Sequence, residues 1–160
     1  MIDSQQCITI LDAMVEGFEK RIEKIKEYKA EIENCLQNEK LITNEKIQSA
    51  INKELSKIEK QIYAMDAKVE SKQEKLLNSN HLDELEKEIL NNAKSINADD
   101  IVFLQSLEDI VNEVKTSEVR NEIEFAFNYI VICEKSTLKQ KTFYEKQLNF
   151  LKEVFKEEKE

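Results

Sequence analysis

The fold class is decided by residues 8–36, which read ITILDAMVEGFEKRIEKIKEYKAEIENCL. Apolar side chains recur in this stretch at alternating steps of three and four residues, and Lys29 occupies one position of the series. The apolar positions are Ile8, Leu11, Val15, Phe18, Ile22, Ile25, Ile32 and Leu36. This spacing is typical of the a/d seam of a coiled coil, which is narrower than the apolar stripe of an ordinary globular helix. A helix with such a seam has to pack against another helix, from the same chain or from a second chain.

The rest of the 160-residue chain has the composition of long amphipathic helices. Charged residues make up 36% of it and hydrophobic residues 41%, with Gly17 as the single glycine and with no proline. Sheets connected by tight turns need residues that adopt positive φ at low cost, so this composition disfavours β-sandwiches, barrels and parallel α/β folds. We therefore predict an all-α protein, an elongated antiparallel helical bundle or coiled coil of four to five helices, which forms a single domain over residues 1–160.

Three helical regions are predicted along the chain. A long coiled-coil region covers about residues 4–77, shorter helices cover about 81–115, and a long C-terminal helix covers about 117–157. The seam loses its phase near residues 37–44 and resumes at Ile51, Leu55, Ile58, Ile62, Met65, Val69 and Leu76. Residues 37–44 form either the loop of a helical hairpin or a stutter within one continuous helix. Because neither glycine nor proline marks a loop there, the continuous helix is slightly favoured.

Two further breaks are predicted from residues that commonly cap helices. Asn80, with Asp83 three residues later, is expected to start a helix after the break at residues 78–80. Asn97, followed by an acidic pair in the first turn, is expected to start another helix after a break at residues 95–97. Asparagine caps and acidic residues both stabilise the N-terminus of a helix, where backbone amides point outward unpaired.

The seam also predicts the core and its polar exceptions. Lys29 and Lys72 fall at seam positions, and a polar residue there weakens a coiled coil but fixes its register and stoichiometry, which favours self-association. The predicted core consists of Leu11, Phe18, Ile22, Ile58, Ile62, Leu104, Leu107, Val111, Ile123, Ile130 and Leu151.

Residues 123–133 are apolar on nearly every side of a helical projection. Their β-branched and aromatic side chains leave a choice between helix and strand, and the spacing of three and four residues that continues through them favours a helix. Such a segment lies either at the centre of the molecule or at an interface with a partner, and central packing is favoured.

The sequence contains no motif for catalysis, for a cofactor or for a metal. One glycine cannot build a phosphate-binding loop. His81 is the single histidine, and Cys7, Cys35 and Cys133 lie far apart, so no zinc or di-iron motif can be assembled. We expect Cys35 and Cys133 in the core, Cys7 exposed near the start of the chain, and His81 in solvent. The predicted function is accordingly binding, without enzymatic activity, cofactor or metal.

The acidic charge is concentrated in one part of the chain. The net charge is −9, and residues 81–124 contain 12 acidic against 4 basic side chains. Such a segment repels phosphate groups, which disfavours direct binding of nucleic acid or of anionic membranes and leaves a basic protein as a suitable partner. We expect no membrane insertion, since no apolar run approaches the ~18 residues of a membrane span. The N-terminus does not resemble a signal peptide, and we expect a cytoplasmic location.

These observations predict a structural or protein-interaction role. We expect the helices to self-associate, as a homodimer, and to present an apolar groove or an acidic face to one client or receptor protein. Two alternatives are a small acidic helical chaperone or adaptor for a secreted or flagellar-type client, and an acidic inhibitor that mimics nucleic acid. The predicted partner-binding residues are Phe125, Phe127, Tyr129, Val131, Ile132, Leu148, Leu151, Phe155, Asp99, Asp100, Glu108 and Asp109.

One short stretch resembles a known family. Residues 97–105, which read NADDIVFLQ, are similar to the segment that follows the long helix in tripartite-motif coiled coils, where an acidic pair precedes Phe-Leu-Gln. In that family the coiled coil dimerises in an antiparallel manner, and the resemblance implies the same for this chain. The zinc ligands of the RING and B-box domains are not present in this sequence, so the resemblance does not imply ubiquitin-ligase chemistry.

Overall fold

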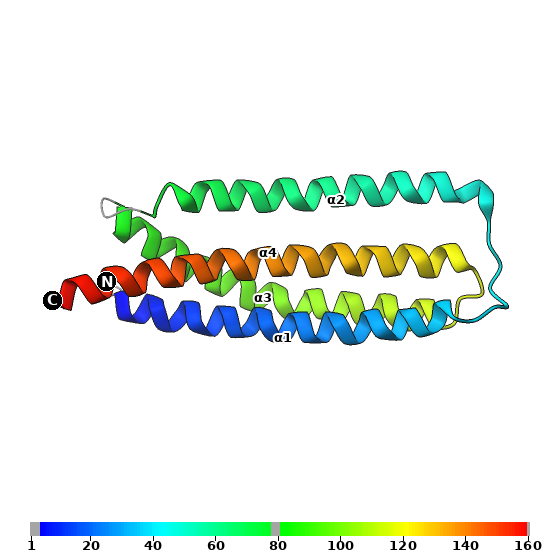
Figure 1. Ribbon diagram of the computed structural model, residues 1–160, viewed down its shortest axis with the longest axis horizontal. Coiled ribbons are helices and arrows are strands. Elements are labelled where there is room, and N and C mark those ends of the chain that lie inside the picture. The colour runs from blue at the N-terminus through cyan, green and yellow to red at the C-terminus, as the bar shows by residue number, and fades with distance from the viewer. Residues whose placement is uncertain (1–3, 78–80, 160) are drawn as a thin grey trace.

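The computed structural model describes residues 4–77 and 81–159, which form four helices (Figure 1). They are α1 (Ser4–Leu36), α2 (Glu45–Glu74), α3 (Leu82–Val114) and α4 (Arg120–Lys159). The predicted all-α bundle is therefore confirmed. Within the described residues no strand forms, and the one β-bridge joins Ile42 to Val119 between two loops. Residues 123–133 are helical, as the spacing of their apolar side chains predicts.

Successive helices run in opposite directions, and α1 begins at the end of the molecule where α4 finishes (Figure 1). The most extensive contact joins α1 to α4, and α3 packs mainly on α1. Helix α2 packs on α4. Because α4 contacts all three other helices, it needs apolar side chains on several faces, which accounts for the composition of residues 123–133.

The core consists of two hydrophobic clusters that follow one another along the bundle. The first cluster combines α1, α3 and α4 near the chain ends. Its buried members are Cys7, Leu11, Met14, Val15, Phe18, Leu85, Ile89, Ala93, Phe143, Tyr144, Leu148 and Leu151. The second cluster combines the same three helices near the opposite end. Its buried members are Ile25, Tyr28, Ile32, Leu107, Val111, Val114, Ile123, Ala126, Ile130 and Cys133.

Residues 37–44 form a loop, so the favoured continuous helix over 4–77 is wrong and the hairpin alternative is right. The loop is held by contacts with a segment far away in the sequence. The backbone amide of Ile42 donates to the carbonyl of Glu118 at 2.9 Å, and the amide of Arg120 donates to the carbonyl of Ile42 at 2.8 Å. The buried side chain of Asn121 accepts from the Asn44 amide at 2.7 Å and donates to the Asn44 carbonyl at 3.1 Å. These bonds satisfy backbone groups that a continuous helix would otherwise pair internally.

The predicted break at residues 95–97 is absent, because α3 continues through it to Val114. Ile96 packs against the first cluster, and Ser95 bonds Asp99 one turn later, so the two residues before the expected cap make contacts that suit a continuing helix. Packing on both sides of the stretch thus overrides its local capping preference. The predicted break at 78–80, with its Asn80 cap, lies outside the described residues.

Most of the predicted core is buried. Eight of the predicted positions are buried, namely Leu11, Phe18, Ile22, Leu107, Val111, Ile123, Ile130 and Leu151. Ile58, Ile62 and Leu104 are only half-buried. The first two of these belong to α2, which is covered mainly by α4.

Three predictions about polar and cysteine positions are refined by the structure. Cys7 is 0% exposed, so its predicted exposure is wrong; α3 and α4 cover it in the first cluster. Cys133 is buried as predicted, whereas Cys35 is half-buried. Lys29 Nζ pairs with Glu134 Oε1 of α4 at 3.1 Å, and Lys72 Nζ pairs with Glu88 Oε1 of α3 at 3.2 Å. Both polar seam positions are therefore satisfied within one chain.

Replacing Gly17 tests the account of α1. Gly17 lies in the helix interior on the exposed face, and a Cβ added there meets no atom within 4 Å. We expect Gly17→Ala to raise the free energy of unfolding by about 0.5–1 kcal/mol, because glycine loses more backbone entropy than alanine in a helix. Ala13→Gly, one turn earlier on the exposed face, is the matched control and should lower it by a similar amount. Chemical denaturation measures both; no gain from Gly17→Ala would contradict the open environment of this position.

The burial of Cys133 predicts its reactivity. Burial raises the pKa of the Cys133 thiol to about 11, despite opposing contributions from Tyr129 and Arg21. Because the thiolate is the reactive form, Cys133 should remain almost unmodified by iodoacetamide at pH 8 in the native protein, as should buried Cys7. Half-buried Cys35 should react first, and all three should react in denaturant. Peptide mass spectrometry gives the rates, and equal rates for Cys133 and Cys35 in the folded protein would refute this burial.

Candidate functional site

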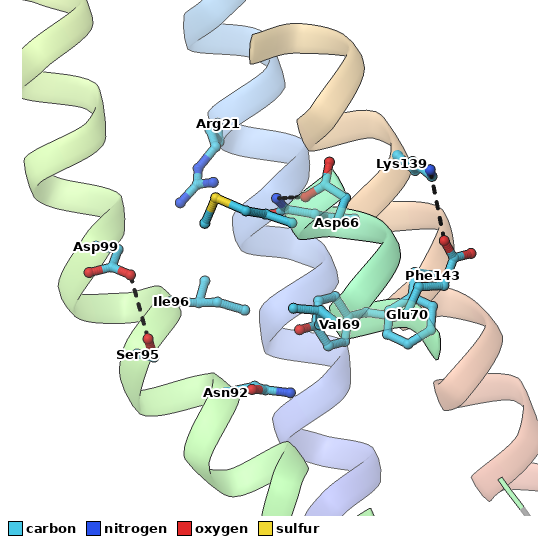
Figure 2. Close-up of a pocket in the computed structure, with 13 residues that line it drawn as sticks. Arg21, Asp66, Val69, Glu70, Asn92, Ser95, Ile96, Asp99, Lys139 and Phe143 are labelled. Carbon is cyan, nitrogen blue, oxygen red and sulfur yellow. Dashed lines mark hydrogen bonds and ion pairs between the residues drawn. The ribbon is translucent and has the colours of Figure 1, made fainter. Parts of the chain in front are cut away.

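A cavity of about 370 Å³ opens near the middle of the bundle, between α2 and α3 (Figure 2). It exists because α2 packs chiefly on α4 and α3 chiefly on α1, so the two helices do not close against each other. Helix α4 contributes Phe143 and Tyr144 to the lining, and α1 contributes Arg21. The volume lies within the usual range of ligand-binding clefts.

The α2 wall of this cavity is apolar and exposed. Met65 and Val69 lie four residues apart on the seam of α2, and 69% and 46% of their surfaces are exposed. Leu55, earlier on the same seam, is buried. Part of a seam that packs against other helices elsewhere in the bundle therefore faces solvent here.

Polar contacts hold α2 in this orientation. Asp66 accepts hydrogen bonds from Ser136 Oγ at 2.8 Å and from Gln140 Nε2 at 3.3 Å, both on α4. One turn and two turns later, Glu70 pairs with Lys139 of α4 and the buried side chain of Gln73 is bonded by Gln147. The face of α2 that contacts α4 is thus a polar stripe beside the seam. Met65 and Val69, on the seam itself, therefore face the cavity.

The α3 wall combines apolar and polar groups. Figure 2 shows Asn92 and Ile96 pointing from α3 toward Val69 of α2. The Nδ2 atom of Asn92 is buried and has no hydrogen-bond partner among the described residues. Asp99, one turn after Ser95, accepts a hydrogen bond from its hydroxyl at 3.5 Å. A buried donor without a partner costs about 1–3 kcal/mol, so Asn92 lowers stability at this wall.

A polar layer fixes α3 on α1 beside the cavity. Arg21 is only 8% exposed, and its Nε donates to Asp100 Oδ1. The guanidinium carbon lies 4.8 Å from the ring centre of Phe103 and 5.5 Å from that of Phe18. The Arg21 guanidinium is buried against these rings, so loss of Asp100 would leave its charge buried and unpaired. Asp100 is therefore part of the framework.

The charges that line the cavity are not equally engaged. Lys139 and Arg21 each have an acidic partner, and Asp66 accepts two hydrogen bonds from α4. Asp99 is exposed and, among the described residues, has no cationic partner. It is the acid of this cavity that remains open to an incoming cation.

The chemistry available in the cavity is that of binding. Burial raises the pKa of the Tyr144 phenol, against an opposing hydrogen bond from Gln73, so the hydroxyl stays protonated near neutral pH. The Tyr144 ring stacks on Phe18 with centroids 5.5 Å apart, which makes it a rigid apolar surface. Within residues 4–77 and 81–159, no group of three His, Cys, Asp or Glu side chains is placed to hold a metal ion.

The structure distributes the predicted partner-binding residues over several environments. Ile132, Leu148 and Leu151 are buried within the chain and belong to its interior. Phe125, Phe127, Tyr129, Val131 and Phe155 are half-buried. Among the acids, Asp99, Glu108 and Asp109 are exposed and Asp100 is half-buried. Only Asp99 from this whole set lines the cavity.

Apart from Asp99, no residue that lines the cavity was predicted as a site residue, and Met65, Val69, Arg21 and Asn92 are among those missed. Met65 and Val69 were recognised only as seam positions, which carry the same signal whether or not a helix covers them. Arg21 and Asn92 were not distinguished from the many polar residues on helix surfaces. No local pattern marks either of them, because their roles depend on the crossing of α3 over α1.

Asn92 provides a test of this geometry. We expect Asn92→Leu to raise the free energy of unfolding by about 1 kcal/mol, because a buried unpaired amide is replaced by an apolar group of similar size. Asn91→Leu, on the exposed face of the same helix, should change it by less than about 0.5 kcal/mol. Destabilisation by Asn92→Leu, measured by urea denaturation, would show that the amide has a partner in solution.

No family model matches this chain, and neither a curated protein nor a solved structure matches it significantly. The resemblance of residues 97–105 to tripartite-motif coiled coils therefore carries no further argument. As far as the helices are described, none combines the length and the apolar character that crossing a bilayer requires.

Proposed function

We propose that this protein is a non-enzymatic protein-interaction module that binds an apolar-faced helix of another protein between α2 and α3. The observation that carries the proposal is the uncovered part of the α2 seam, where Met65 and Val69 stand exposed across a cavity from Ile96. Binding an amphipathic helix in an apolar groove is a common mode of recognition, with anchors spaced three or four residues apart. The spacing of Met65 and Val69 suits such anchors.

A heterologous partner is favoured over a homodimer. The homodimer was expected because a narrow seam needs a covering helix, and the seam of α1 is covered by α3 and α4 of the same chain. A homodimer remains a prediction. If it forms at this cavity, a second copy of the chain would contact the exposed part of the α2 seam. A chaperone or adaptor that holds a client helix would use the same groove and is a special case of this proposal.

Substitution of Val69 tests the proposal. Val69→Asp should abolish capture of a stoichiometric partner from the native source, because a charge enters the apolar wall. Ala67→Asp adds the same charge about 200° around the exposed side of α2 and should capture as wild type does. Both variants should keep the wild-type circular dichroism and melting temperature, since both positions are exposed.

Two results would contradict the proposal. Equal capture by all three proteins would show that the cavity is not the binding site. A dimer mass by light scattering that Val69→Asp converts to a monomer would show that a second copy of this chain covers α2 instead.

A further inference from the structure

We infer that the helix which enters this groove is basic, with lysines or arginines flanking its apolar stripe. The inference rests on the proposed function and adds the chemistry of the partner. It follows from the different charges of the two helices that flank the groove. Helix α3 carries nine acidic side chains against two lysines, whereas α2 carries six of each sign. A helix lying between them therefore has an acidic neighbour on one side and a balanced one on the other.

An exposed stripe on α3 continues from the cavity along the helix. Ser95 and Asp99 line the cavity, and Val102, Ser106 and Asp109 follow at steps of three, four and three residues, so all five lie on one face. All five are exposed, Val102 to 67%. The stripe offers one apolar contact between two carboxylates. A partner helix that places an apolar side chain over Val102 would bring cationic side chains near Asp99 and Asp109.

The other acids of α3 near the cavity already have partners. Asp100 is bonded by Arg21 and Glu88 by Lys72, both within the chain. Asp109 accepts only a neutral hydrogen bond, from Gln105 at 3.0 Å, and Asp99 only one from Ser95. Among the described residues, these two carboxylates of the stripe have no cationic partner.

Charge also disfavours the other occupants. A second copy of this chain would bring the same acidic face, in a protein of net charge −9, against α3. Like charges placed opposite each other oppose association. A phosphate-bearing ligand meets the same repulsion. A cationic helix instead gains attraction from α3 and apolar contact from Met65, Val69 and Val102.

Defined peptides test the inference by fluorescence anisotropy. The probe is a synthetic helical peptide of about 18 residues, five turns, with a leucine stripe flanked by lysines. A second peptide has glutamates in place of the lysines, and a third keeps the lysines but scrambles the leucines. We expect the lysine-flanked peptide to bind at least about tenfold more tightly than either of the others. Its affinity should fall as salt rises from 50 to 500 mM, because exposed charge pairs are screened.

Protein variants distinguish the groove from general attraction to an acidic protein. Asp99→Asn with Asp109→Asn should weaken the lysine-flanked peptide about three- to tenfold and flatten its salt dependence. Asp12→Asn with Glu16→Gln, which removes two exposed acids of α1, is the matched control and should leave affinity unchanged. Val69→Ser should weaken binding at any salt concentration, because it removes an apolar contact and no charge.

The contrary outcomes distinguish failure of this inference from failure of the proposed function. Equal binding of lysine- and glutamate-flanked peptides, with both sensitive to Val69→Ser, would overturn the basic partner and leave the proposed function standing. The same holds if capture of a native partner depends on Val69 while no lysine-flanked peptide binds. Binding of the lysine-flanked peptide that ignores Val69→Ser and the Asp99/Asp109 variant would overturn the inference as nonspecific attraction. Absence of both peptide binding and Val69-dependent capture would overturn the proposed function itself.

Discussion

The antiparallel contact between α1 and α4 places every other part of the molecule. These two helices share both hydrophobic clusters, and each then receives one further helix: α3 packs mainly on α1 and α2 on α4. In a bundle where all four helices met around one axis, the α2 seam would be covered from two sides. Here α2 has one main neighbour. The cavity beside Met65 and Val69 therefore follows from which helices pack on one another, and no separate local cause is needed.

Much of the fold could be predicted from the period of apolar residues. The errors of that prediction have one origin. Steps of three and four residues identify helices and the inward face of each, because the pattern itself contains that information. The ends of helices depend on competition with distant groups. The loop at residues 37–44 is stabilised by Glu118, Arg120 and Asn121, so no glycine or proline was needed to mark it. At residues 95–97 the opposite occurred, since packing of Ile96 outweighs a good capping sequence.

The site was less accessible to sequence reasoning, because exposure depends on how the helices are arranged. An apolar pattern is present in the sequence both at residues 123–133 and at Met65 and Val69. Residues 123–133 belong to α4, whose apolar side chains pack against three other helices. Met65 and Val69 belong to α2, which has one main contact. The strongest apolar signal therefore marked the centre of the bundle, and the weaker signal marked its open side. Charge was a better guide, since most of the acidic excess of residues 81–124 lies on α3, and Asp99 from this segment lines the cavity.

The walls of the cavity are held apart by polar contacts, and this bears on how a partner would bind. The Arg21–Asp100 pair fixes the middle of α3 on α1. Asn121 holds the start of α2, and the Gln73–Gln147 pair holds its end on α4. Collapse of α2 onto α3 would cover Met65 and Val69 but would break the contacts that hold α2 on α4, leaving buried amides without partners. Each such amide costs about 1–3 kcal/mol, which offsets what burial of an apolar side chain gains. An occupant thus meets a groove that is already formed, so little of its binding free energy is spent on rearranging the bundle.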